Sequence, residues 1–226
     1  MKMIPTRTRS VLQMAQQRFP NKTATQSYLL ASVPLKNNQT NYKFDFNQKT
    51  EFPNVYLNST DTFICDKLGF FLAAVKRSER GTEYLQTYPN VNIFPTLTPP
   101  PATLATGSPA SQRNEHLYLV YNGYYKVVLD NKVYFEKMDM HRHLYIPQTQ
   151  TNVEPTASRE STLAGYVNLE PFIIFNGEKK HEIEVVLPSV SNMLIEAVRQ
   201  ITPDTQDKDH LLVCKALGVL VSSGAR

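Results

Sequence analysis

Two histidines, His141 and His143, are the residues whose spacing most resembles a metal site. On a β-strand, residues i and i+2 point to the same face, so both imidazoles would reach one ion. A metalloenzyme built on a β-barrel would add a glutamate within the next few residues. The residues that follow, Leu144–Pro147, carry no carboxylate. We therefore expect surface or interface histidines, with no bound metal and no cofactor.

Paired carboxylates are the second candidate for chemistry. Glu182 and Glu184 alternate with Ile183 and Val185, which is the pattern of a strand with one solvated face. Two carboxylates across a cleft could hydrolyse a glycoside, but 20 acidic residues supply many accidental pairs. The chain also lacks the nucleophile-elbow, phosphate-loop, dinucleotide and zinc-protease motifs. No residue is therefore predicted to be catalytic, and the sequence favours a protein that is not an enzyme.

Charge is the third signal, because it is unevenly distributed. Residues 1–44 hold seven basic residues and no acidic one, whereas the whole chain has a net charge of +4. Positive charges without counter-charges can meet phosphates or a neighbouring subunit, or can simply be solvated. The residues that we single out for nucleic-acid or subunit contact are Lys2, Arg7, Arg9, Arg18 and Lys22.

These basic residues belong to an expected N-terminal arm, residues 1–26, which precedes a single β domain at 27–226. Thr6 or Thr8 can cap a short helix in the arm, and Pro20 ends it. A helix of about ten residues is marginal in isolation. We therefore expect it to be ordered only against a neighbour.

After the arm, the apolar residues follow the two-residue period of β-strands. Tyr42, Phe44 and Phe46 alternate with Lys43 and Asp45, as in a half-buried strand. Antiparallel strands with long loops fit an all-β sandwich, with one or two short helices, and the jelly roll is a common form at this length. Other strand-like runs lie at 28–35, 63–75, 82–88, 117–121, 124–129, 133–135, 143–146, 165–169, 171–175, 183–187 and 211–221.

Turn signals connect several of these runs. Asn-Gly pairs at 122–123 and 176–177 predict tight turns, because both residue types tolerate positive φ. The first pair would join strands 117–121 and 124–129 in a hairpin. A further turn at 130–131 would extend this hairpin to a three-stranded meander.

The remaining segments are a helix and two long loops. Ser191 or Asn192 can cap a helix that runs through Gln200, with a proline beyond its end. Residues 95–114 and 147–160 are rich in proline and small polar residues and lack apolar periodicity. Loops of that length are expected to be functional or mobile.

Cys65 and Cys214 both lie in apolar runs, so we expect buried free thiols; a disulfide between adjacent strands remains the alternative. The first twenty residues lack the apolar core of a signal peptide, and no run approaches 18 apolar residues. The sequence thus favours a protein that is not secreted and has no membrane span.

A succession of strand-like segments follows the basic arm: Leu29-Leu30 to Leu35, Tyr42–Phe46, Thr62–Val75, 117–135 and Arg142–Pro147. In this layout, most of the chain resembles the small jelly-roll coat or minor virion proteins of icosahedral viruses, especially tailless bacteriophages. The resemblance implies a virion component made in the host cytoplasm, with its basic arm turned towards the capsid interior. This arm is less arginine-rich than those of many small RNA-virus coats, so only weak genome contact is expected.

The leading hypothesis is therefore a capsid or minor virion subunit that assembles with copies of itself and with other virion proteins. The first alternative is a β-sandwich receptor- or carbohydrate-binding module with Tyr121, Tyr124 and Tyr125 as its platform. The second is a cupin-like metal-dependent enzyme that uses His141 and His143. Only the virion subunit requires large assemblies, and only the cupin-like enzyme requires a bound ion.

Overall fold

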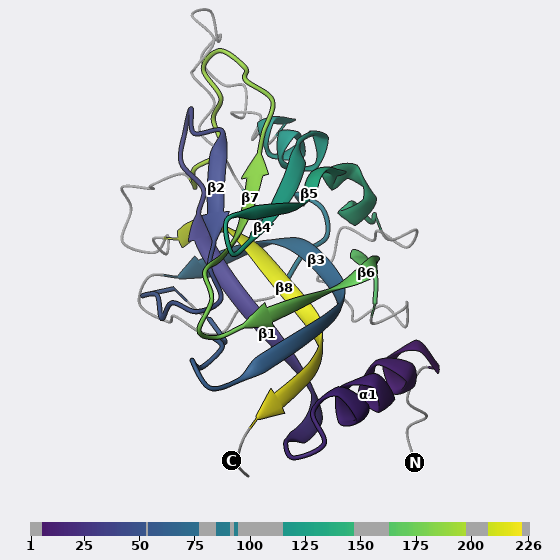
Figure 1. Ribbon diagram of the computed structural model, residues 1–226. Coiled ribbons are helices and arrows are strands. Elements are labelled where there is room, and N and C mark those ends of the chain that lie inside the picture. Colours follow the sequence, from purple (N-terminus) through teal and green to yellow (C-terminus); the bar gives the residue numbers. More distant parts are fainter. Residues whose placement is uncertain are drawn as a thin grey trace, which may run out of the picture.

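The described residues form two four-stranded antiparallel sheets packed face to face, with one α-helix outside them (Figure 1). This arrangement confirms the predicted all-β sandwich. The predicted long loops, 95–114 and 147–160, lie outside the described residues. The computed structural model describes residues 6–52, 54–76, 85–90, 93–94, 115–146, 163–197 and 208–222.

The first sheet joins β1 (Thr23–Pro34), β8 (Lys208–Ser222), β3 (Thr62–Lys76) and β6 (Tyr166–Asn176), in that order. Its two central strands, β3 and β8, are buried on both faces. A strand covered on both sides needs apolar residues at successive positions. This explains why β3 and β8 are continuous apolar runs in the sequence rather than alternating ones.

The second sheet joins β2 (Asn41–Phe44), β7 (His181–Val186), β4 (Tyr124–Leu129) and β5 (Lys132–Asp139), in that order. Along β2 and β4, buried side chains alternate with more exposed ones. The second sheet therefore has one face towards the core and one face towards solvent along these strands, as the alternating pattern predicts.

Aromatic side chains fill the space between the two sheets. Phe44 of β2 meets Phe70 of β3 edge to face, with ring centroids 6.0 Å apart. Phe46 meets Phe175 of β6 in the same way, at 5.4 Å. All four are at most 1% exposed, and burying one such ring contributes about 1.5–3 kcal/mol. The interior is thus a packed apolar core to which both sheets contribute.

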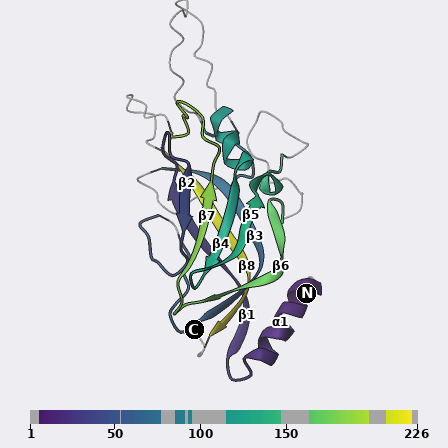
Figure 2. The same cartoon turned by 45° about the horizontal axis from the view of Figure 1, so that its top comes forward.

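The N-terminal helix α1 (Thr6–Arg18) packs against the outer face of the first sheet (Figure 2). Val11 and Ala15 are fully buried there, against a cluster that includes Ile64 and Val219. The helix therefore has its neighbour within the same chain, and β1 begins at Thr23, before the expected domain boundary at residue 27.

Neither Asn-Gly pair adopts the predicted turn with positive φ. Their glycines are required by close backbone contacts instead: a Cβ on Gly123 would lie 2.2 Å from the oxygen of Val186, and one on Gly177 would lie 1.8 Å from the oxygen of Asn58. The tight turn with positive φ is at residues 130–131, where φ is 51° and 62°. It joins β4 and β5, as predicted.

The predicted strand at 117–121 is wrong, because these residues belong to the 3-10 helix η1 (Glu115–Asn122). Leu117, Val120 and Tyr121 are all fully buried. Their spacing of three and four residues is that of one helical face. The predicted hairpin and meander therefore reduce to the single β4–β5 hairpin.

The predicted helix from residue 191 is also wrong over its described part: residues 198–200 lie outside the described residues, and none of residues 191–197 is helical. Partners from elsewhere in the chain satisfy their backbone groups. The Asn37 side chain accepts hydrogen bonds from the N–H groups of Ile195 and Glu196, at 2.8 and 3.0 Å. These long-range bonds replace the ones that a helix would make within the segment.

Candidate interaction surfaces

Arg7 fastens helix α1 to the first sheet. Its Nε donates to Oδ1 of Asp66 on β3 at 2.5 Å, and its Nη1 donates to Oε1 of Glu170 on β6 at 2.6 Å. Its Nη2 donates to the backbone oxygen of Leu169 at 2.5 Å, and its guanidinium carbon lies 5.1 Å from the centre of the Phe172 ring. One residue from the predicted contact set is therefore committed to contacts within the chain.

A β-bulge places the carboxylate that Arg7 binds. Against β8, the register of β3 shifts by one residue between Cys65 and Lys67, so Asp66 is the extra residue there. Asp66 is only 1% exposed and also pairs with the Lys67 ammonium. A carboxylate at that depth requires cationic partners. In turn, the hydrogen bond to Glu170 and the interactions with Asp66 raise the pKa of Arg7.

The other basic residues of the arm lie in different surroundings. Arg9 and Arg18 are exposed on α1. Lys22 follows the helix, and its ammonium donates to the backbone oxygen of Thr60 at 3.4 Å. Lys2 lies outside the described residues. Arg9 and Arg18 are thus the described arm residues best placed to meet an external partner.

The two histidines with metal-like spacing do not share a face. Both lie in the 3-10 helix η2 (Met140–His143), so the strand predicted at 143–146 is wrong. His141 is exposed, whereas His143 is fully buried and its Nδ1 donates to the backbone oxygen of Gly165 at 2.9 Å. The expectation of a surface histidine is therefore wrong for His143. Within the described ranges, no three His, Cys, Asp or Glu side chains form a metal-binding group.

Two further histidines, His181 and His210, are also buried. Burial lowers the pKa of all three, to about 4 for His143 and His210. A neutral imidazole is favoured because the surrounding apolar side chains cannot solvate a charge. Sequence reasoning missed this set, because each histidine directly follows a charged residue and the sequence does not show which way its ring points.

The tyrosine platform proposed for a carbohydrate-binding module does not form. Tyr121 and Tyr125 are at most 1% exposed, and Tyr124 is half-buried. Burial raises the pKa of both Tyr121 and Tyr125. Their rings therefore belong to the core rather than to a binding surface.

The two thiols are free and buried, as predicted. They lie on adjacent strands but not opposite one another: Cys65 of β3 pairs with Gly218, and Cys214 of β8 pairs with Phe70. Burial raises the pKa of both thiols. They contribute to packing and are poor nucleophiles in the folded state.

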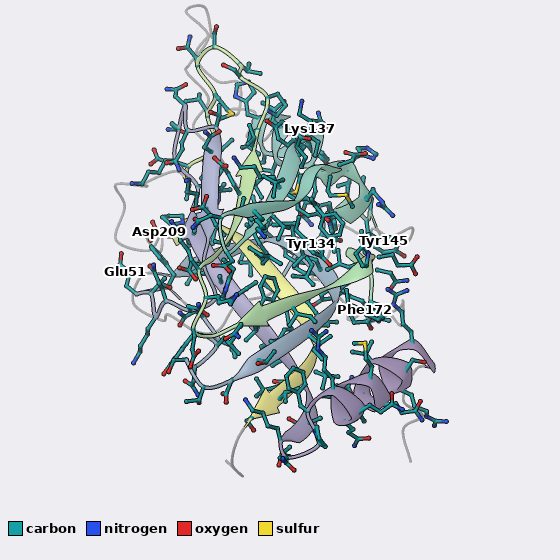
Figure 3. The ribbon with its side chains drawn as sticks, viewed as in Figure 1. Glu51, Tyr134, Lys137, Tyr145, Phe172 and Asp209 are labelled. Atoms are coloured by element: carbon teal, nitrogen blue, oxygen red, sulfur yellow. The ribbon has the colours of Figure 1, made fainter. Side chains whose placement is uncertain are left out.

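The sandwich is tied together along one side, where β5 and β6 are the edge strands of their sheets. The Tyr134 hydroxyl of β5 donates to the backbone oxygen of Phe172 on β6 at 3.1 Å (Figure 3). The register of β5 shifts twice against β4, which marks β-bulges. Bulges and charges both disfavour pairing of an edge with another chain. The charged residues of β5 are Lys132, Glu136, Lys137 and Asp139.

The opposite side of the sandwich has β2 and β1 as its edges. β2 has only four residues and includes Lys43. β1 has twelve residues, none of them charged, and its side chains at Thr25, Gln26 and Tyr28 are exposed. Of the four edge strands of the two sheets, β1 is thus the longest, and it is the one that contains no charged residue.

Comparison with models of protein families, with curated proteins and with solved structures finds no match for this chain. Among the helices that the structure describes, none has the length and apolar character needed to span a membrane.

Proposed function

We propose that this chain is a viral structural protein, a capsid or minor virion subunit that assembles with copies of itself through lateral contacts. The observation that carries the proposal is the strand order. The first strand neighbours the last in one sheet, β1-β8-β3-β6, and the second neighbours the seventh in the other, β2-β7-β4-β5. An eight-stranded double sheet of this kind supports a jelly roll, an architecture that many viral capsid subunits use.

Lectins and cupins also use jelly rolls, so the core and the surface must decide between them. A cupin needs an interior with metal ligands, whereas His143 packs against the rings of Phe70 and Tyr125, at 5.0 and 5.6 Å between centroids. A sugar-binding module needs exposed aromatic rings, and the tyrosines predicted for that role are largely in the core. A filled interior favours a protein whose function resides on its outer surface.

The proposal includes weak contact with the genome through the arm. Arg9 and Arg18 are exposed on α1, whereas Arg7 binds carboxylates of its own sheet. Few free cations among the described arm residues imply few phosphate contacts and a shallow dependence of binding on salt. In this proposal the mature protein resides in the virion after synthesis in the host cytoplasm.

Particle size is the test. The purified protein is followed by sedimentation velocity and electron microscopy while its concentration and the salt concentration are raised. We expect closed particles of many subunits, because symmetry multiplies contacts that are individually modest. A chain that stays monomeric throughout, or that binds glycans as a monomer, would overturn the proposal.

A further inference from the structure

The outer edge of β1 is a regular strand, and part of it has unused backbone groups. Its register with β8 runs from Thr23 to Pro34 without a shift, so it has no bulge. In the part of the chain that the structure describes, the only strand-like contact on its outer side is a single bridge between Leu30 and Val55. Among the described residues, the edge from Thr23 to Tyr28 is left without a neighbouring strand.

The hydrogen bonds show which backbone groups point outward. Leu30 exchanges both of its backbone hydrogen bonds with Val55, at 3.0 and 2.8 Å, on the side away from β8. In an antiparallel strand, N–H and C=O groups of alternate residues point to the same side. Ala24, Gln26 and Tyr28 therefore present their N–H and C=O groups outward, and no hydrogen bond within the described chain uses them.

The other three edges lack this combination of features. β5 has two bulges and four charged residues, and β2 has four residues in all. β6 contains Pro171, which has no N–H to donate, next to the charged Glu170. Since an exposed flat edge without charges invites pairing, β1 is the edge on which another strand would add.

We propose that two copies of this chain pair through the outer edges of their β1 strands, in antiparallel orientation about a two-fold axis at Gln26. This inference rests on the proposed function and specifies one of its lateral contacts. Gln26 then faces Gln26 of the second copy, and Ala24 faces its Tyr28. Each of the three outward N–H groups of one copy meets a C=O group of the other. The two first sheets become one continuous sheet across the axis.

The side chains fit this pairing because it is self-complementary, as a two-fold contact must be. β1 has no charged residue, so no like charges meet at the axis. Tyr28 is 42% exposed and its ring lies 4.6 Å from the Lys215 ammonium of its own chain. In the paired sheet, this ring would cover the small side chain of Ala24 from the second copy. Large and small side chains would then alternate across the axis.

A strand pair with six residues from each copy buries less surface than the roughly 1,200–2,000 Å² of a standard interface. The strand pair is therefore a weak contact on its own. Such contacts suit a many-subunit assembly, in which each subunit makes several of them.

The test places charges at the two-fold axis. In Gln26→Lys, two lysines would face each other, and we expect the dissociation constant of the pair to rise about tenfold or more. Gln26→Glu should weaken pairing in the same way. An equimolar mixture of the two variants should restore it, because lysine then faces glutamate. The matched control is Gln13→Lys, the same change on the exposed face of α1, which should pair as the unchanged protein does. Sedimentation velocity on the full chain is the readout.

Cross-linking gives a second measurement. Residues that face each other as a hydrogen-bonded antiparallel pair have Cα atoms about 5.5 Å apart, within the range of about 4.4–6.8 Å that a disulfide spans. Gln26→Cys should therefore form a dimer under mild oxidation, and Gln13→Cys should not. Folding of each variant is checked by its thermal unfolding.

The outcomes separate this contact from the proposed function. If particles form and the Gln26 variants assemble and cross-link no differently from the Gln13 controls, the β1 contact is refuted and the virion proposal stands. If only dimers form, and charge at Gln26 abolishes them, the contact is supported and the virion proposal fails. A chain that stays monomeric at every concentration refutes both.

Discussion

Acid is expected to destabilise the folded protein through its buried histidines. The pKa is about 4 for both His143 and His210 in the folded state, against about 6.5 in an unfolded chain. Above about pH 6.5 neither state binds the proton, so stability is unaffected. As the pH falls from about 6.5 to about 4, the unfolded chain takes up protons that the folded chain excludes, and stability is lost.

The size of the effect follows from the pKa difference. Each unit is worth about 1.4 kcal/mol, so each histidine costs roughly 3 kcal/mol once the pH is below about 4. At about pH 5 the loss is roughly 2 kcal/mol for each, or about 4 kcal/mol for the two. Most domains have only about 5–15 kcal/mol of stability in total. Mild acid should therefore remove a large part of the stability of this protein.

The assay is urea unfolding at a series of pH values between about 7.5 and 5. Near pH 5, each buried histidine should contribute a slope of roughly 1 kcal/mol per pH unit. His143→Gln should reduce the slope of the whole protein by that amount, whatever it does to stability at neutral pH. His141→Gln is the matched control, because His141 is exposed two residues away. If His143→Gln and His141→Gln leave the same slope, the burial argument is wrong.

Three further predictions concern the contacts that hold the sandwich and its helix together. Arg7→Ala should lower the free energy of unfolding by about 1–3 kcal/mol, because it leaves the buried carboxylate of Asp66 with one cation fewer. Arg9→Ala, the exposed control, should change the free energy of unfolding by less than about 0.5 kcal/mol. Equal effects of the two variants in urea unfolding would contradict the role given to the Arg7–Asp66 ion pair. Tyr134→Phe should cost about 0.5–1.5 kcal/mol through the lost hydrogen bond between the two edge strands, so an unchanged unfolding midpoint would count against that link. Cys65 and Cys214 should resist a thiol reagent in the native protein and react together on unfolding, because both are fully buried; fast labelling of either thiol without unfolding would refute this.

Local patterns in the sequence predicted much of the sandwich. The alternation at Tyr42, Phe44 and Phe46 reports one buried face, and this burial is what the structure shows. The helix in the arm was also predictable, and it ends at Arg18, before Pro20; the threonines proposed as its cap, Thr6 and Thr8, lie within the helix instead. Such signals work because the period of a strand or helix is set by backbone geometry alone.

The errors occurred where distant partners outweighed local signals. The N–H groups at 195 and 196 bind the Asn37 side chain rather than their own helical turn. Gly123 and Gly177 are needed because another strand or loop passes close to them, not because of their φ. A turn signal in one segment cannot report a backbone that approaches from another.

The candidate interaction surfaces show the same division. Composition and spacing alone determined an all-β chain with a basic N-terminal segment and two buried thiols, because strand periodicity and residue polarity are local properties. Only the tertiary structure decided that Arg7 binds Asp66 of its own sheet, and that β1 is the long uncharged edge. Both depend on which strands become neighbours. Strand order is set by the burial of two sheets against each other. The free energy of this burial depends on contacts between segments that are far apart in the sequence, so no single segment can predict it.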